Sequence, residues 1–419
     1  MRSYISPRSR SAATVLLLSL SAAAAMPAAA PAATPAEVED SIIVRFKPGT
    51  SATEQKAVLN KVAAENADGL GIAGVRRVEL PAAESRDEAI TAIENHPAVD
   101  WVEKDVVMKT AGRPVTDALR TSAWNMNKID APGAWNLVTG TGTTIAVLDT
   151  GVAFTNPALA GAQWINPGEI AGNGIDDDGN GFVDDVAGWD FVNGDASPQD
   201  EHGHGTQVSG VAAGRGGGLG VVGVAPRARI MAIQVCTPRG GCPLSSVVSG
   251  LAYARRMGAD VANMSLAWGA DLQAVRAAVE AAPDLFVVAA SGNNGIDLGQ
   301  PGVFFSPCEL AETHANVICV GATTSLDALA RFSNRGPAVT VVAPGYGIET
   351  TSHLGGTITA TGTSMAAPHV AGAAALRIAR GGVNSLTLRR VLEAGTDQVA
   401  AGPRLNAQKV VTTGMRRRQ

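Results

Sequence analysis

The chain has 419 residues, of which 46% are hydrophobic and 17% are charged, with a formal net charge of −5 and 48 glycines. This length suits one large domain with smaller attached pieces, and the glycines indicate many tight turns. The composition argues against binding to nucleic acid, because the one run of arginines, at 416–418, is too short to form a basic surface.

The N-terminal segment is typical of a secretory signal peptide. Three arginines precede an apolar stretch, Ala12–Leu20, and the alanine-rich tract Ala22–Ala33 offers several small-x-small cleavage positions. We therefore expect a signal peptide at 1–33 and a secreted protein, extracellular or periplasmic. A disordered Ala/Pro leader is the alternative. No later apolar run reaches the length of a membrane span, so no membrane association is expected after signal cleavage.

Strand-like and helix-like segments alternate between Ser41 and Lys109. The pattern predicts strands at 42–46, 75–80 and 99–107 and helices at 54–65 and 88–94. This order favours a compact α+β sandwich of ferredoxin-like type, which we place at 38–110. A linker is predicted at 111–123, where Gly112 and Pro114 interrupt regular structure.

The segment 124–419 is predicted to form the main domain. Buried strands are expected at 144–148, 230–235, 261–265, 285–290 and 317–320, and helices at 246–256, 272–281 and 364–380. Such an alternation of strands and helices implies a mostly parallel sheet with helices on both faces.

The four cysteines fall into two local pairs. In an oxidising compartment, disulfides Cys236–Cys242 and Cys308–Cys319 are the simplest of the three connectivities. A zinc site is disfavoured, because a cysteine cluster requires shorter spacings and no histidine stands at ligand spacing.

Two polar residues occupy positions that suit catalytic groups. Asp149 directly follows the strand 144–148, at the end where open α/β sheets place ligands. His204 lies in a glycine-rich turn, which leaves an imidazole uncovered, as a general base requires. The alternatives are an Asp that caps a turn and a metal site formed by His202 and His204, although their i, i+2 spacing differs from that of helical zinc proteases.

The segment Gly362–His369 carries the most specific motif. Ser364 stands at the start of an expected helix among small residues, where its exposed hydroxyl and the positive helix end suit a nucleophile. A helix-capping serine is the alternative. Asn293 follows the strand 285–290 in a glycine-containing loop, and its amide can donate to an oxyanion together with the Ser364 N–H.

These motifs resemble those of the subtilisin family of serine peptidases, the subtilases, whose triad follows the chain order Asp, His, Ser. The resemblance covers about Trp124 to Val411. It implies a subtilisin-like three-layer α/β sandwich with a mostly parallel central sheet, preceded by the small ferredoxin-like α+β unit. It further implies that Asp149 orients the imidazole, His204 is general base and acid, Ser364 is the acylated nucleophile, and Asn293 supports the oxyanion.

The same resemblance places a polypeptide substrate between two strand edges. One edge is at 263–267 and the other is at 240–242. The residues expected to contact substrate are Ser265, Leu266, Ala267, Gly240, Gly241, Ala290 and Gly292. Ala267 and Trp268 stand where the family commonly has glycines, so we expect a primary pocket that is narrowed or has an altered rim.

The segments 41–49 and 96–105 resemble the opening and closing strands of the family's inhibitory propeptide. The unit at 38–110 is then expected to assist folding, to block the cleft as an intramolecular inhibitor, and to be removed by cleavage within 111–123. The mature product is expected to be a monomer. A permanent accessory domain is the alternative.

An acidic run between Asp149 and His204 resembles an EF-hand calcium loop. Ala187 stands where that loop has its last glutamate, and Asp185 is expected to substitute for it. A structural Ca²⁺ is favoured over a solvated acidic turn, because crowded carboxylates repel each other without a cation. The expected ligands are Asp176, Asp178, Asn180, the Phe182 carbonyl, Asp184 and Asp185.

The sequence therefore predicts a secreted serine endopeptidase that is made as an autoprocessed zymogen. Two other functions stay open: a relative that keeps the fold and binds peptides without catalysis, and a dedicated processing protease with one or few targets.

Overall fold

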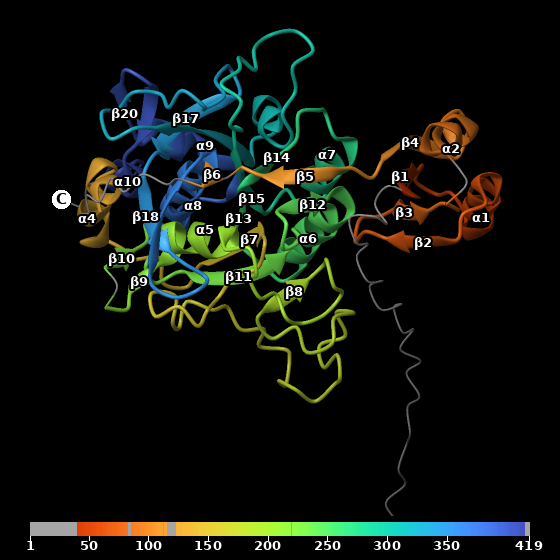
Figure 1. The fold of residues 1–419 in the computed structure, drawn as a ribbon, viewed down its shortest axis with the longest axis horizontal. Coiled ribbons are helices and arrows are strands. Elements are labelled where there is room, and N and C mark those ends of the chain that lie inside the picture. The colour runs from red at the N-terminus through yellow and green to blue at the C-terminus, as the bar shows by residue number, and fades with distance from the viewer. Residues whose placement is uncertain (1–39, 83–84, 112, 115–122, 219, 415–419) are drawn as a thin grey trace, which may run out of the picture.

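The computed structural model describes residues 40–82, 85–111, 113–114, 123–218 and 220–414 (Figure 1). The predicted signal peptide, most of the predicted linker and the arginine run at 416–418 lie outside the described residues. Within them, no helix has both the length and the hydropathy that crossing a bilayer requires.

The N-terminal unit, residues 40–104, is a four-stranded antiparallel sheet with two helices. Its sheet has the order β2-β3-β1-β4, which is the ferredoxin-like topology that the sequence predicted. The elements are β1 Ser41–Phe46, α1 Ala52–Leu59, β2 Asn66–Gly69, β3 Val75–Glu79, α2 Arg86–Ile93 and β4 Val99–Lys104.

Two details of this unit differ from the sequence prediction. The helix expected at 54–65 ends at Leu59 and continues only as a short 3₁₀ turn, Asn60–Val62. Strand β2 was not predicted, because its sequence Asn-Ala-Asp-Gly lacks the branched and aromatic residues that favour strands. Pairing with β3, rather than intrinsic preference, holds β2 extended.

The larger unit is built on a nine-stranded sheet of order β20-β21-β17-β16-β15-β13-β7-β11-β8. All neighbours are parallel except β20 and β21. The strands are β7 Thr144–Asp149, β8 Gly188–Asp190, β11 Arg229–Gln234, β13 Val261–Met264, β15 Phe286–Ala290, β16 Val317–Thr323, β17 Val339–Pro344, β20 Thr396–Val399 and β21 Gly402–Leu405. β11 and β13 flank β7 on opposite sides, so the strand order reverses there, and such a switch point is where open α/β sheets bind ligands.

Helices cover both faces of this sheet (Figure 1), which confirms the predicted three-layer α/β sandwich. Ile145 and Val147 pack in one apolar cluster with α5 and α8, whereas Ala146 and Leu148 pack in a second with α6 and α7. The unbroken apolar sequence of β7 thus reflects a strand buried on both faces. The helices are α3 Trp124–Lys128, α4 Ala131–Trp135, α5 His204–Ala213, α6 Leu244–Arg256, α7 Gln273–Glu280, α8 Thr363–Arg380, α9 Ser385–Ala394 and α10 Ala407–Thr412.

The N-terminal unit packs Ile43, Leu70 and Val75 in the same apolar cluster as α6 and α7, and two carboxylates at its end, Glu103 and Asp105, contact the starts of these helices. Glu103 accepts hydrogen bonds from the backbone N–H groups of Gln273 and Ala274, in the first turn of α7. Asp105 Oδ1 accepts from Ser245 N, in the first turn of α6. The first N–H groups of a helix lack partners within it, and they attract negative charge. The two carboxylates therefore cap both helices at once.

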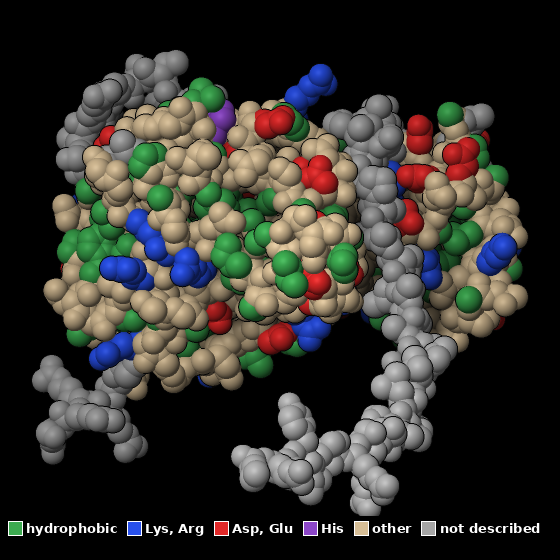
Figure 2. All heavy atoms as spheres, turned by 90° about the horizontal axis from the view of Figure 1, so that it is seen from below, with side chains coloured by type: hydrophobic (Ala, Val, Ile, Leu, Met, Phe, Trp, Pro, Cys, Tyr) green, Lys and Arg blue, Asp and Glu red, His purple; other side chains and the backbone are tan. Residues whose placement is uncertain are grey.

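Figure 2 shows the charged side chains of the described residues on one face of the molecule. Acidic and basic side chains of the described residues are interspersed there with neutral and hydrophobic ones. This mixture agrees with the weakly acidic composition of the chain.

Asp105→Ala tests the docking contact. Asp105 is fully buried and pairs with Arg77 at 3.3 Å, and loss of one partner of a buried ion pair costs about 3–5 kcal/mol. We expect the free energy of unfolding of the intact chain to fall by about that amount in denaturant titration. The control Asp100→Ala, in an exposed pair with Arg45, should cost less than about 1 kcal/mol. Equal small losses in both variants would contradict the capping role.

Candidate active site

Asp149 and His204 meet at the switch point of the sheet. Asp149 ends β7, and His204 begins α5. The His204 Nδ1–H lies 2.7 Å from Asp149 Oδ1 and 2.9 Å from Oδ2, and both side chains are buried. Burial opposes protonation of the imidazole, but the charge of Asp149 and its hydrogen bond outweigh burial, so the pKa of His204 is raised.

A second buried carboxylate, Asp200, supports this pair. Its Oδ1 accepts from Thr150 Oγ1 at 2.8 Å and from Gly203 N at 2.6 Å, and its Oδ2 accepts from Thr206 Oγ1 at 2.6 Å. Thr150 Oγ1 in turn accepts from Gly205 N. Asp200 thus holds the turn that carries His204 against Thr150, the residue after Asp149. The sequence analysis did not identify Asp200, because no local pattern shows which groups its carboxylate binds.

Ser364 lies in the first turn of α8, which follows Gly362. A Cβ on Gly362 would overlap the carbonyl oxygen of Ala111, so only glycine fits there. Ser364 Oγ and His204 Nε2 are both buried, and neither has a hydrogen-bond partner within the described residues. Buried polar atoms without partners are rare, and catalytic groups are one recognised cause.

Asn293 is held by the residue that precedes Ser364. Its Oδ1 accepts from Thr363 N at 2.9 Å and from Thr363 Oγ1 at 3.0 Å. This contact fixes the amide orientation, so Nδ2 points the opposite way and donates to the Ala111 carbonyl oxygen. Ser364 N donates to the same oxygen at 3.4 Å. Two donors therefore converge on one carbonyl, the arrangement that stabilises an oxyanion.

Strand β5, Val107–Thr110, runs from the N-terminal unit into the larger unit (Figure 1). It pairs antiparallel with β12, Gly241–Pro243, on one side and with β14, Leu266–Ala267, on the other. The sequence had predicted a single strand at 99–107, but β4 and β5 are separate and belong to different sheets.

The predicted substrate-contacting residues lie along the two edges of β5. Gly240 O accepts from Thr110 N at 3.3 Å, and Ser265 O accepts from Ala111 N at 2.9 Å. Gly241 pairs with Lys109 in the β12 register, while Leu266 and Ala267 pair with Thr110 and Lys109 in the β14 register. Ala290, the last residue of β15, and Gly292 precede Asn293 and have no pairing with β5.

Beyond Ala111 the chain pairs with a further strand of the larger unit. Strand β6, Arg113–Pro114, pairs antiparallel with β19, Thr357–Thr361, which itself pairs with β18, Ile348–Thr351. The Ala111 carbonyl, which accepts from the two donors, thus follows the paired strand β5 and precedes the paired strand β6. Gly112, between Ala111 and β6, lies outside the described residues.

Comparison with known proteins decides the family. A model of the subtilase family matches residues 140–407, and a model of the fervidolysin N-terminal prodomain matches residues 23–105. The chain belongs to the subtilase family.

Individual relatives agree with this subtilase assignment. A thermophilic serine proteinase from Bacillus sp. (strain AK1) is 32% identical over 376 residues, which cover 87% of this chain and 84% of that protein. Thermitase from Thermoactinomyces vulgaris is 34% identical over 293 residues, which cover 68% of this chain and 94% of thermitase. The crystal structure of a cold adapted subtilisin-like serine proteinase matches with a TM-score of 0.52 at 31% identity, over 64% of this chain and 90% of that one. The chain is a subtilisin-like serine peptidase with a prodomain.

Among the described residues of the subtilase, one cluster of carboxylates is suited to a cation. Glu169, Asp178 and Asp185 each present an oxygen, and these oxygens lie within 4.8 Å of one another. Asp178 and Asp185 belong to the predicted calcium ligands. Glu169 was not predicted, because it precedes the acidic run; its carboxylate accepts from the backbone N–H groups of Asp177 and Asp184.

Of the predicted carboxylate ligands, Asp176 and Asp184 are not part of this cluster. The carboxylate of Asp184 accepts from the N–H groups of the segment 172–174, and that of Asp176 accepts from Asn180 N and Gly181 N. Asn180 Nδ2 donates to Asp178 and Asp185. The Phe182 ring packs against three aromatic side chains, Trp189, Phe191 and Tyr253.

The cluster fits a hard divalent cation. Its donors are oxygens only, which Ca²⁺ prefers. Burial raises the pKa of Asp185 to about 6, despite hydrogen bonds from Tyr253, Asn166 and Asn180 that act in the opposite direction. A cation beside Asp185 would offset the cost of its buried charge.

The subtilase has the two disulfides that the sequence predicted. Cys236–Cys242 joins the segment after β11 to β12, one edge of the cleft, and Cys308–Cys319 joins the 3₁₀ segment Cys308–Glu312 to β16. The first disulfide thus anchors a strand that pairs with β5.

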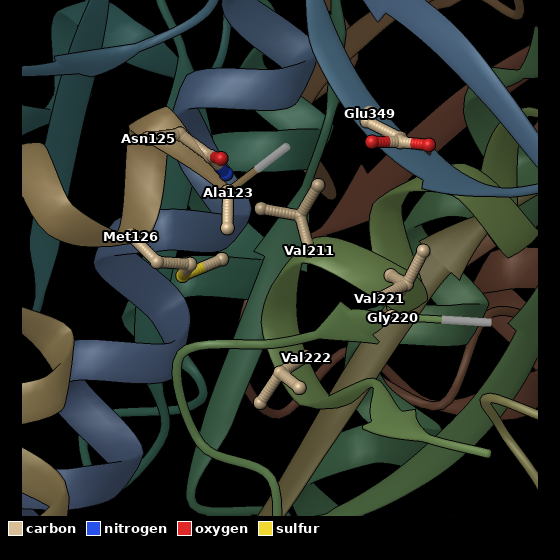
Figure 3. Close-up of a pocket in the computed structure, with 9 residues that line it drawn as sticks. Ala123, Asn125, Met126, Val211, Gly220, Val221, Val222 and Glu349 are labelled. Atoms are coloured by element: carbon tan, nitrogen blue, oxygen red, sulfur yellow. The ribbon is translucent and has the colours of Figure 1, made fainter. Parts of the chain in front are cut away.

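A small pocket lies between α3, α5 and β18 (Figure 3). Its volume of about 20 Å³ holds no more than a water molecule or so. It is lined by Ala123, Asn125, Met126, Gly210, Val211, Gly220, Val221, Val222 and Glu349, none of which contacts β5, so it adds nothing to the peptide cleft.

Proposed function

We propose that this subtilase is the precursor of a secreted serine endopeptidase that acylates Ser364 and removes its own propeptide by cutting after Ala111. The observation that carries the proposal is the Ala111 carbonyl oxygen, which accepts from Asn293 Nδ2 and Ser364 N while β5 fills the cleft. A peptide bond held in this way is placed as a substrate.

The proposed reaction uses four groups. His204 Nε2 takes the proton of Ser364 Oγ as the oxygen attacks the Ala111 carbonyl carbon, and Asp149 holds the imidazole in the required tautomer. Asn293 Nδ2 and Ser364 N stabilise the oxyanion. His204 then protonates the amine of Gly112 as the carbon–nitrogen bond breaks, which leaves an acyl group on Ser364. Water, activated by His204, hydrolyses that ester and restores the serine.

The N-terminal unit would act as an intramolecular inhibitor. It is docked through Glu103 and Asp105, and β5 continues from it between β12 and β14. Even after cleavage, these contacts would hold the segment ending at Ala111 in the cleft. Release or degradation of residues up to 111 would then open the site to other polypeptides.

Export and calcium are further parts of the proposal. The leader at 1–33 and the two disulfides support secretion, since disulfides persist in oxidising compartments. Ca²⁺ would bind Glu169, Asp178 and Asp185, where it would neutralise packed carboxylates and stabilise the long segment between Asp149 and His204. It would take no part in the reaction.

An activity-based probe tests the central proposal. A fluorophosphonate should label the mature protein at one residue, Ser364, and Ser364→Ala should abolish labelling because the nucleophile is lost. Labelling is read by gel fluorescence and peptide mapping. The control Ser209→Ala removes another buried serine without a hydrogen-bond partner and should leave labelling intact. A folded, unlabelled wild type would instead favour a peptide-binding relative without catalysis.

The pH dependence tests the role of His204. A general base must be neutral, and the raised pKa of His204 should place the acid limb of kcat/KM at a higher pH than an ordinary histidine would. Asp149→Asn removes the charge that raises this pKa, so the limb should move to lower pH, with kcat reduced by roughly 10⁴. His314→Asn, at a site paired with Glu280, should leave the limb in place. An unshifted limb in Asp149→Asn would argue against this assignment.

Removal of Ca²⁺ tests the carboxylate cluster. If free Ca²⁺ is at about 100 times its dissociation constant, chelation should cost about 2.7 kcal/mol, or about 5 °C in Tm. Asp178→Asn should lower Tm and abolish the chelator effect. The neighbouring Asp177→Asn should keep it, because the Asp177 carboxylate bonds to Ile170 N and Asn173 instead. A wild-type Tm insensitive to chelator would remove calcium from the proposal.

A further inference from the structure

The space available to the Ala111 side chain is bounded by two segments. Ala111 N donates to Ser265 O on one side, and its carbonyl oxygen accepts from Asn293 on the other. Both backbone groups of Ala111 are thus fixed between the segments 265–269 and 290–293. Ala111 is 6% exposed and packs in the same apolar cluster as Ala290.

The ring of Phe305 spans the far side of this gap. A Cβ added to Gly292 would lie 2.5 Å from Phe305 Cε1 and 2.8 Å from Cδ1. A Cβ added to Gly269 would lie 3.5 Å from Cε2 and 3.9 Å from Cζ of the same ring. One edge of the ring therefore faces Gly292 and the opposite edge faces Gly269, so the ring joins the two segments.

The backbone around Phe305 is fixed. Ser306 N donates to Trp268 O at 2.9 Å, and Trp268 N donates to Ser306 O at 3.0 Å. The Phe305 carbonyl accepts from Glu309 N at 3.3 Å, and Cys308, three residues after Phe305, forms the disulfide to Cys319. These contacts fix the backbone from which the Phe305 ring projects.

We infer that Phe305 closes the pocket for the residue that precedes the cleaved bond, so that the enzyme selects peptides with a small side chain, such as alanine, at that position. The inference rests on the proposed function. A large side chain would have to displace the Phe305 ring, and such overpacking opposes binding of that side chain. The sequence had assigned the narrowing to Ala267 and Trp268, but the Trp268 backbone instead holds the segment that carries Phe305.

The test uses substrates copied from β5. The mature enzyme is assayed with Met-Lys-Thr-Xaa p-nitroanilides in which Xaa is Ala, Leu or Phe. Wild type should cleave the Ala substrate with a kcat/KM at least about 100-fold above that of the Phe substrate, within the range that pocket contacts provide. Phe305→Gly should raise the Phe-to-Ala ratio by about 10-fold to 100-fold. Phe304→Gly, which changes the exposed neighbouring ring, should leave the ratio unchanged.

Fluorophosphonate titration separates the two ways of failing. If the wild type is labelled yet cleaves the Phe substrate as well as the Ala substrate, the pocket inference is overturned and the proposed function stands. If the wild type is folded and unlabelled, both are overturned. If Phe305→Gly does not fold, the Phe-to-Ala substrate ratio of the wild type still tests the inference. Phe305→Leu should then give a ratio between that of the wild type and that of an open pocket.

Discussion

The convergence of two donors on the Ala111 carbonyl oxygen is the constraint on which the rest of the structure depends. Asn293 Nδ2 reaches that oxygen because Thr363 holds the other end of its amide, and Ser364 N reaches it because Gly362 leaves room. The sheet supplies β7 and β15, and α8 supplies Thr363 and Ser364. The carboxyl ends of β7 and β15 meet beside the cleft only because the strands of the sheet are parallel and buried on both faces.

The same constraint links the N-terminal unit to the site. The Ala111 carbonyl is held in the cleft beside Ser364. The chain before it is fixed where Glu103 caps α7 and Asp105 caps α6. Apolar contacts of Ile43, Leu70 and Val75 with the layer of α6 and α7 complete the docking, beside carboxylates that meet the positive helix ends. The position of the unit thereby sets which peptide bond stands next to Ser364.

Much of this arrangement was predictable from sequence, because the informative residues end strongly patterned elements. Asp149 ends an apolar strand, and His204 and Ser364 stand in glycine-containing turns at helix starts, so residue pattern and family resemblance agreed. Less was predictable where partners are distant in sequence. Asp200, Glu169 and Phe305 act through contacts across loops, and β2 is extended only because β3 pairs with it. Gly292 was predicted to contact substrate, but nothing local identified the Phe305 ring that lies against it.

The most direct test of the account is the position of the first cut in the full chain. Mass spectrometry of the secreted protein at early times should find an N-terminus at Gly112, and Ser364→Ala should keep the bond after Ala111 intact, because the Ala111 carbonyl accepts from both Asn293 Nδ2 and Ser364 N. A first cut at another bond in wild type, or cleavage after Ala111 in Ser364→Ala, would contradict the account.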